Sequence, residues 1–152
     1  MATLDQYIIA LERFISSFPK KVDEIILNNE QYFISKIQDR LYDEGKDGNG
    51  QSLGTYSLFY ENYKRDIGAV YDHVTLFNTG SFYGEMFMSV FNGVVDVFSK
   101  DEKTPAILEM FTGFDVFGFT EQEQEFLYEK IIKPDILELI ITLPSTIKIE
   151  IV

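Results

Sequence analysis

The sequence predicts an α+β fold: an N-terminal helical pair packed on a small antiparallel sheet, then C-terminal helices and a terminal strand. Three observations predict it. Apolar residues recur at spacings of three and four over the first 43 residues, an Asn-Gly pair separates two β-prone runs, and the last six residues alternate apolar with polar. The 152 residues are 45% hydrophobic and 15% aromatic, enough for one core. We expect a single α+β domain over residues 1–143 and a C-terminal strand arm over residues 144–152.

The first two helices are predicted from one apolar stripe. The first should end at Phe18, because a residue that precedes proline avoids the helical region. Pro19 can then begin a second helix, which we expect to run to about residue 43. The stripe comprises Leu4, Tyr7, Ile8, Leu11, Phe14, Ile15 and Phe18, then Val22, Ile26, Phe33, Ile37 and Leu41.

The middle of the chain begins with a loop. Residues 45–54 (GKDGNGQSLG) contain four glycines together with Asp-Gly and Asn-Gly pairs, which are turn signals. A short helical segment rich in tyrosine is expected before Gly68, and residues 73–77 (HVTLF) are β-prone. The Thr79-Gly80 pair should form a structural turn that sets how a strand starting near Phe82 leaves it.

An Asn-Gly pair at residues 92–93 predicts a hairpin, because a type I′ turn needs positive φ at both positions. A two-residue loop pairs Phe91 with Val94 and Phe87 with Phe98. One face is then wholly apolar and should sit on the helices; it carries Met88, Val90, Val95 and Val97. Phe87, Phe91 and Phe98 lie on the opposite face and are our candidate interface residues.

The C-terminal third should be mostly helical. Thr104-Pro105 begins a short helix that Gly113 ends, and Thr120 to Glu123 forms a capping box for a longer one. Pro134 should kink or break that longer helix, which resumes over residues 135–143. Residues 147–152 (IKIEIV) read as a strand too short to be stable alone. It either joins its own sheet or adds to that of a neighbour, which makes Ile147, Ile149 and Ile151 interface candidates.

Charge and composition exclude several classes of function. Lys and Arg total 13 against 25 Asp and Glu, for a net charge of −12, which argues against nucleic-acid binding and against an anionic membrane surface. The absence of cysteine excludes disulfides, thiolate zinc sites and a cysteine nucleophile. The N-terminus lacks the basic region of a signal peptide, and no apolar run reaches the ~20 residues of a membrane span. We expect synthesis in a cytoplasm.

Three parts of the sequence are candidates for a chemical site: His73, the loop from Asp43, and Asp115. His73 is the one histidine and cannot form a metal cluster by itself, so a structural or solvated role is favoured. The loop from Asp43 partly matches a calcium loop, but it has glycine at positions 3 and 12. Asp115 lies among four phenylalanines and could be an acid in an apolar pocket, although the sequence identifies no second carboxylate for it. We therefore expect no catalytic, metal or cofactor site.

Three segments resemble a known family when taken in order. They are residues 38–57 (QDRLYDEGKDGNGQSLGTYS), 74–83 (VTLFNTGSFY) and 115–125 (DVFGFTEQEQE). Their order and spacing resemble small virion morphogenesis proteins of tailed phages, including tail-completion and head–tail joining proteins, in versions from phages and prophages of Bacteroides-like bacteria. The element "Leu, two residues, Thr-Gly, one residue, bulky apolar" is here Leu76, Thr79, Gly80 and Phe82. The family's basic stretch is shortened to Lys64-Arg65, and the terminal strand lies outside the similarity.

The resemblance implies a non-enzymatic structural protein of the phage neck or tail. Its partners would be portal, neck or tail subunits, in a homo-oligomeric ring or a mixed assembly, with the protein located in the virion after assembly in the host cytoplasm. The Gly45–Gly54 loop and the terminal strand would serve as interface elements. Two alternatives remain: an acidic phage or prophage protein that binds a host target, and a small hydrolase that uses carboxylates such as Asp115.

Overall fold

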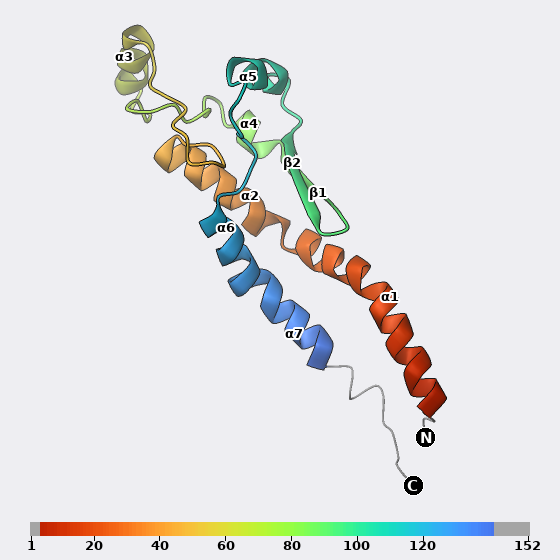
Figure 1. Ribbon diagram of the computed structural model, residues 1–152. Helices are drawn as coiled ribbons and strands as arrows, with labels where there is room; N and C mark the ends of the chain where they lie inside the picture. Colours follow the sequence, from red (N-terminus) through yellow and green to blue (C-terminus); the bar gives the residue numbers. More distant parts are fainter. Residues whose placement is uncertain (1–3, 142–152) are drawn as a thin grey trace.

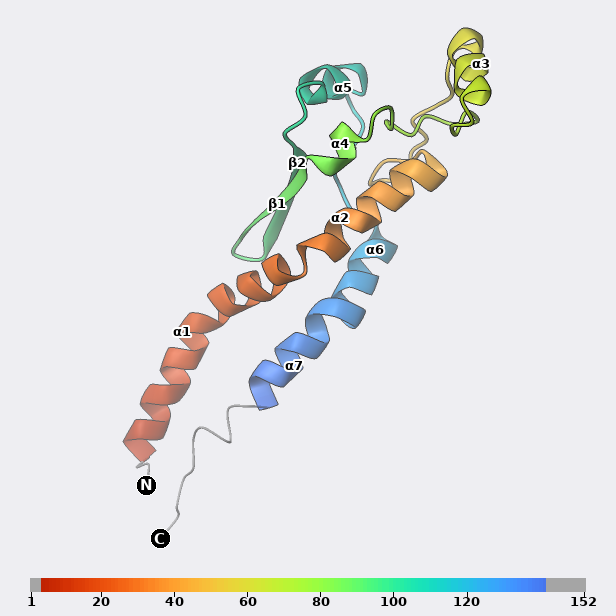
Figure 2. The same ribbon diagram turned by 180° about the vertical axis from the view of Figure 1, so that it is seen from behind.

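The computed structural model describes residues 4–141 and shows an elongated mixture of helices with one two-stranded antiparallel sheet (Figures 1 and 2). The helices α1 and α2 follow one another along a rod, and α6 and α7 form a second rod beside it. The hairpin, α4 and α5 lie on the other side of α2. The elements are α1 (Leu4–Asn28), α2 (Glu30–Asp39), η1 (Arg40–Glu44), α3 (Leu58–Asp66), α4 (Ser81–Gly84), β1 (Met86–Phe91), β2 (Val94–Ser99), α5 (Thr104–Met110), α6 (Glu121–Phe126), η2 (Leu127–Ile132) and α7 (Lys133–Ile141).

The expected break at Phe18 and Pro19 is wrong, because α1 continues through Pro19 to Asn28. Proline removes one backbone donor from a helix. Pro19 is exposed, so water can bond to the carbonyl that this leaves free. The chain turns instead at Asn29, whose side-chain amide donates to the Ile25 carbonyl at 2.8 Å. Asn29 thereby satisfies a carbonyl at the end of α1 and separates α1 from α2.

At Pro134 we expected a kink or a break; the break does not occur, because the helix continues from Glu121 to Ile141. The capping box at its start is confirmed: the Thr120 hydroxyl accepts from the Glu123 amide at 3.2 Å, and the Glu123 carboxylate accepts from the Thr120 amide at 3.0 Å. A π-helical turn, η2, lies directly before Pro134. Such a wide turn adjusts the hydrogen-bond ladder, so that a proline can follow without ending the helix.

The sheet consists of β1 and β2 alone among the described residues. Phe91 pairs with Val94 and Phe87 with Phe98, while Asn92 and Gly93 between the strands both have positive φ. Both turn amides donate to the Asp23 carboxylate of α1, at 3.0 and 2.7 Å. This contact fixes the hairpin tip against the first helix.

The core lies along α2 and η1, where Ile37 and Leu41 are fully buried. One face of the hairpin closes it with Met86, Met88 and Val97. The β-prone segment 73–77 is not a strand, which corrects our expectation. Its Val74 amide donates to the Gly54 carbonyl at 3.0 Å, and Leu76 adopts a positive φ that no regular strand allows. The expected terminal strand, with Ile147, Ile149 and Ile151, lies outside the described residues.

Candidate functional site

The best-satisfied polar groups in the protein form a junction between residues 40–54 and residues 115–123, here called the polar junction. Its centre is Arg40, which is 4% exposed. The Arg40 guanidinium donates to the carbonyls of Lys46 at 3.1 Å and Gly118 at 2.8 Å, and it also pairs with the Glu123 carboxylate. A buried charge is tolerated only when it is paired and hydrogen-bonded in this way.

A second buried charge, Asp47, completes the polar junction. Its carboxylate has no exposed surface and accepts from three backbone amides, those of Asn49 (3.0 Å), Gln51 (2.8 Å) and Asp115 (2.9 Å). The Gly48 amide donates to the Asp115 carbonyl at 2.7 Å. The glycine-rich loop and the segment after α5 are therefore joined as one unit.

The three segments that carry the phage resemblance all meet at or near this junction. Residues 38–57 and 115–125 form it. The middle segment, residues 74–83, is joined to residues 38–57 through Thr75, whose amide donates to the Tyr56 hydroxyl at 3.1 Å. The Thr75 carbonyl also accepts from the hydroxyl of Tyr83, within the middle segment. Burial raises the pKa of the Tyr83 phenol well above its ordinary value, so this donor stays protonated. The residues of the three motifs thus make structural contacts with one another.

His73 and the calcium-like loop make structural contacts, while Asp115 contributes backbone hydrogen bonds and its side chain is exposed. The Nε2 atom of His73 lies 2.7 Å from the Tyr42 carbonyl, and its Nδ1 atom lies 2.8 Å from Asp72. Asp115 is exposed and not in an apolar pocket, which corrects that expectation, although the phenylalanines around it are partly buried. The calcium-like loop uses Asp47 for backbone amides, and within residues 4–141 no group of His, Asp or Glu side chains is arranged to hold a metal ion.

The expected turn at Thr79 and Gly80 begins a short helix. Gly80 has φ 88°, and the Thr79 hydroxyl lies 3.0 Å from that of Ser81. Phe82 falls within α4 and is buried, so the strand begins at Met86 and not near Phe82 as we expected.

The N-terminal part of α1, residues 4–21, is here called the arm; it is a different segment from the C-terminal strand arm expected over residues 144–152. It projects from the body (Figures 1 and 2). Among the α1 residues whose burial the structure describes, Ile26 is the first that is buried. Helical spacing places one apolar stripe on the same face as Val22 and Ile26; it includes Leu4, Ile8, Leu11, Ile15 and Phe18. Ile15 is 67% exposed and Leu4 63% exposed.

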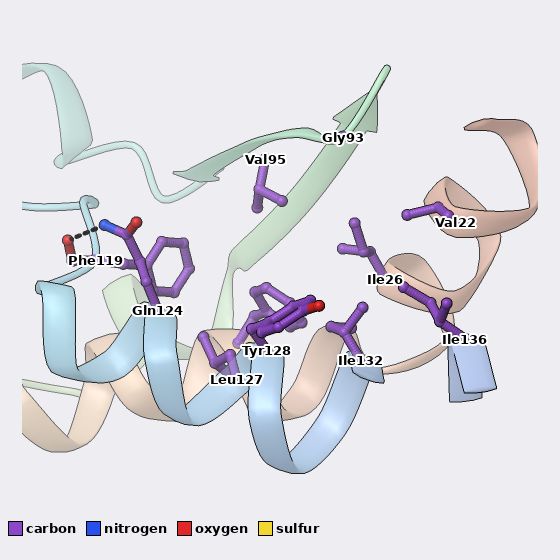
Figure 3. A pocket seen from close by; sticks show the side chains of 11 residues that line it. Val22, Ile26, Gly93, Val95, Phe119, Gln124, Leu127, Tyr128, Ile132 and Ile136 are labelled. Atoms are coloured by element: carbon purple, nitrogen blue, oxygen red, sulfur yellow. Dashed lines mark hydrogen bonds between the residues drawn. The ribbon is translucent and has the colours of Figure 1, made fainter. Parts of the chain in front are cut away.

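An apolar groove of about 470 Å³ lies between α1, the hairpin and the helix α6–η2–α7 (Figure 3). Val22 and Ile26 point into it from α1, and Val95 points into it from β2. The opposite side of the groove is formed by the C-terminal helix, through Leu127, Ile132 and Ile136. Phe119, in the loop just before α6, completes this side. Phe119 is held in place because its carbonyl accepts from the Gln124 side chain at 3.0 Å.

The candidate interface phenylalanines differ in how open they are. Phe91, at the hairpin tip, is 76% exposed and its pair Val94 is 62% exposed. Phe98 is partly covered by Phe117, with ring centroids 5.6 Å apart, and the Lys100 ammonium lies 4.7 Å from the Phe87 ring centre. Phe91 is therefore the most open of the three.

Sequence reasoning missed both the groove and the polar junction. The groove residues belong to stripes that we assigned to the core, and the signal that could have revealed the junction is a charged residue, Arg40, among core positions. No helix among residues 4–141 is long and apolar enough to cross a membrane. No protein-family model, curated protein or solved structure matches the chain. The site is thus defined by its geometry: an apolar arm, an open hairpin tip bonded to Asp23, and an apolar groove, beside a polar junction of buried charges.

Proposed function

We propose that the chain is a structural subunit of a tailed-phage neck or tail, of the head–tail joining or tail-completion kind, which acts by protein–protein assembly and not by catalysis. The observation that carries the assembly part is the arm: among the α1 residues whose burial the structure describes, none before Ile26 is buried. The virion part rests on the resemblance of residues 38–125.

The energetics of the arm favour a partner. A helix gains most of its stability in proteins from packing an amphipathic face, and the described body does not bury this one. Covering one large aliphatic side chain is worth about 1.5–3 kcal/mol. Ile8 is 45% and Ile15 67% exposed, so covering both would contribute about 2–3 kcal/mol to an interface.

The open hairpin tip supports the same proposal. Phe91 and Val94 stand beside one another on the exposed end of the sheet. Interfaces are enriched in aromatic residues at their centres, and Asp23 holds this tip in one orientation. The partners would be portal, neck or tail subunits, in a homo-oligomeric ring or a mixed assembly, since contacts between unlike surfaces close into a ring when the rotation allows. The protein would be located in the virion after assembly in the host cytoplasm, without bound nucleic acid or membrane.

Detection in purified particles tests the proposal. Phage particles from a host that produces this chain are banded by density, and the chain is sought by mass spectrometry and by labelled antibody in electron micrographs. We expect a fixed copy number per particle and label at the neck or the tail. A chain that is abundant in the lysate and absent from particles would overturn the virion assignment.

The net charge of −12 favours one second candidate, an acidic protein that binds a host target. In that case the same lysate would yield the chain in a stable complex with a host protein, and the particles would lack it. Exposed carboxylates such as Glu121 and Glu125 would then make the contact, and their replacement by glutamine would release the host protein.

A further inference from the structure

The free edge of β2 lies beside Val95, whose side chain lines the apolar groove, and the hydrogen-bond pattern of the hairpin shows what kind of chain would fit there. The Met88 amide of β1 donates to the Glu30 carboxylate at 2.8 Å, so it points away from β2. Met88 is paired with Val97, and pairs in an antiparallel ladder alternate between bonded and non-bonded. The backbone N–H and C=O of Val95, two residues along, therefore point away from β1.

Val95 thus offers a donor and an acceptor beside the groove. Within residues 4–141, no hydrogen bond joins its backbone to another element, and its side chain lines the groove. An unpaired strand edge beside an apolar surface suits an extended peptide whose alternate side chains are apolar. Main-chain hydrogen bonds would hold such a peptide, and the groove would take its side chains.

The chain itself contains one such peptide, residues 147–152, with the sequence IKIEIV. In an extended conformation Ile147, Ile149 and Ile151 share one face, while Lys148 and Glu150 share the other. The first face matches the apolar lining of the groove formed by residues such as Leu127 and Ile132. The second face carries charge and suits the solvent side.

The direction of α7 favours a groove on another copy. Ile136 is the last α7 residue that lines the groove, and the helix continues to Ile141, which adds about 7.5 Å in the direction away from it. Figures 1 and 2 show α7 ending beyond the hairpin tip. To reach its own groove, the chain would have to reverse within residues 142–146 and then retrace this distance. A segment that continues from α7 needs no reversal to meet a neighbour.

We infer that residues 147–152 of one copy dock in the groove of a second copy, as an added strand beside Val95 with the three isoleucines in the groove. This inference rests on the proposed assembly function and specifies the contact by which two copies of the chain would bind each other. Because the donor segment and the acceptor groove are different surfaces, each copy can give to one neighbour and receive from another. Such contacts build a ring or a chain of subunits.

Disulfide trapping in the full-length chain tests the inference, because the natural sequence has no cysteine. One variant carries Asp96→Cys, at an exposed position on the face of β2 opposite Val95, and the other carries Lys148→Cys, which the docked strand would place on that same face. The two are mixed and oxidised mildly. We expect a disulfide-linked heterodimer at a yield about tenfold above that of a control mixture in which Glu109→Cys, on exposed α5, replaces the β2 cysteine.

Competition and two further variants show what the contact requires. An excess of a synthetic peptide of residues 142–152 should suppress the heterodimer, and the same peptide with its three isoleucines changed to threonine should not. Val95→Pro removes the N–H that points away from β1 and no donor to β1, so the yield should fall, while Val95→Ala keeps that N–H and should retain the yield. An unchanged circular dichroism spectrum of the Val95→Pro chain shows that the fold is kept. Adding Ile149→Thr to the Lys148→Cys chain should lower the yield without touching the described body.

Two outcomes would overturn the inference. If a chain that carries both cysteines closes only within itself, at every protein concentration, its own tail fills the groove. If the yield equals that of the Glu109→Cys control, the groove is not the site of this segment. Either result could accompany a positive particle experiment, in which case the assembly function stands and only this contact is wrong.

Discussion

The polar junction buries charged side chains, whereas the arm exposes apolar ones. In the junction, charged residues such as Arg40 and Asp47 are buried, and each makes several hydrogen bonds. In the arm, large aliphatic residues such as Ile15 stand exposed on a helix. The first region stabilises the subunit from within, because every buried polar group is satisfied. The second can gain stability only from contacts outside the described body.

The difference separates two kinds of mutational effect. Changes in the junction should alter the stability of the isolated chain, because they leave buried polar groups without partners. Changes in the arm should leave the isolated chain almost unchanged and alter association. The following predictions test this separation, from the largest expected effect on stability to the smallest.

Arg40→Ala should have the largest effect. It removes the bonds to the Lys46 and Gly118 carbonyls and leaves the Glu123 carboxylate without its partner. Breaking a buried ion pair by removing one partner costs about 3–5 kcal/mol. Urea unfolding followed by circular dichroism would measure the loss, with Arg13→Ala on the exposed side of the arm as the control. A loss as small as that of the control would show that the junction does not hold the fold together.

Gly48→Ala tests the close approach of the two junction segments. A Cβ atom on Gly48 would lie 2.7 Å from the carbonyl carbon of Gly118, closer than packed atoms allow. Forced overpacking of this kind costs about 1–3 kcal/mol. Gly84→Ala is a matched control, since a Cβ atom there meets nothing within 4 Å. Equal unfolding midpoints for the two variants would contradict the approach of Gly48 to Gly118.

Gly93→Val tests the hairpin tip, where we expect an effect on stability between those of the junction and the arm. Gly93 has φ 75°, which a β-branched residue resists. A left-handed conformation costs an L-residue about 1–2 kcal/mol, and the variant should lower the melting temperature accordingly. The bond from its amide to Asp23 should also weaken. An unchanged melting temperature would mean that the turn is not under this constraint.

Ile15→Ser should have the smallest effect on stability, within about 0.5 kcal/mol, because the side chain is already exposed in the subunit. It should nevertheless weaken self-association or particle incorporation, measured by light scattering over a range of concentrations and by yield in particles. Ser16→Ala, one residue along and off the apolar stripe, is the control. If Ile15→Ser destabilises the chain as much as Gly48→Ala, the arm is part of the body and the comparison fails.

Several elements could be read from local residue patterns. The helix that the Thr120–Glu123 capping box begins and the helix after Thr104 follow from signals within a few residues. So does the mixed class of helices with one antiparallel pair of strands. Local rules failed at Pro19, where the helix continues; at Pro134 only the break, and not the kink, is contradicted. They also failed at residues 73–77, where β-prone residues are drawn into contacts with the loop at Gly54.

The amino-acid sequence by itself determined that the N-terminal and C-terminal segments are mostly helical, that one pair of strands is antiparallel, and that the protein is strongly acidic. These properties depend on neighbours a few residues apart and on simple composition. Only the tertiary structure decided that Arg40 and Asp47 are buried, that Asp115 is exposed, and that a groove lies open between α1, the hairpin and the C-terminal helix. Those features depend on contacts between residues up to about a hundred positions apart, as between Asn29 and Asp135, which no local pattern encodes.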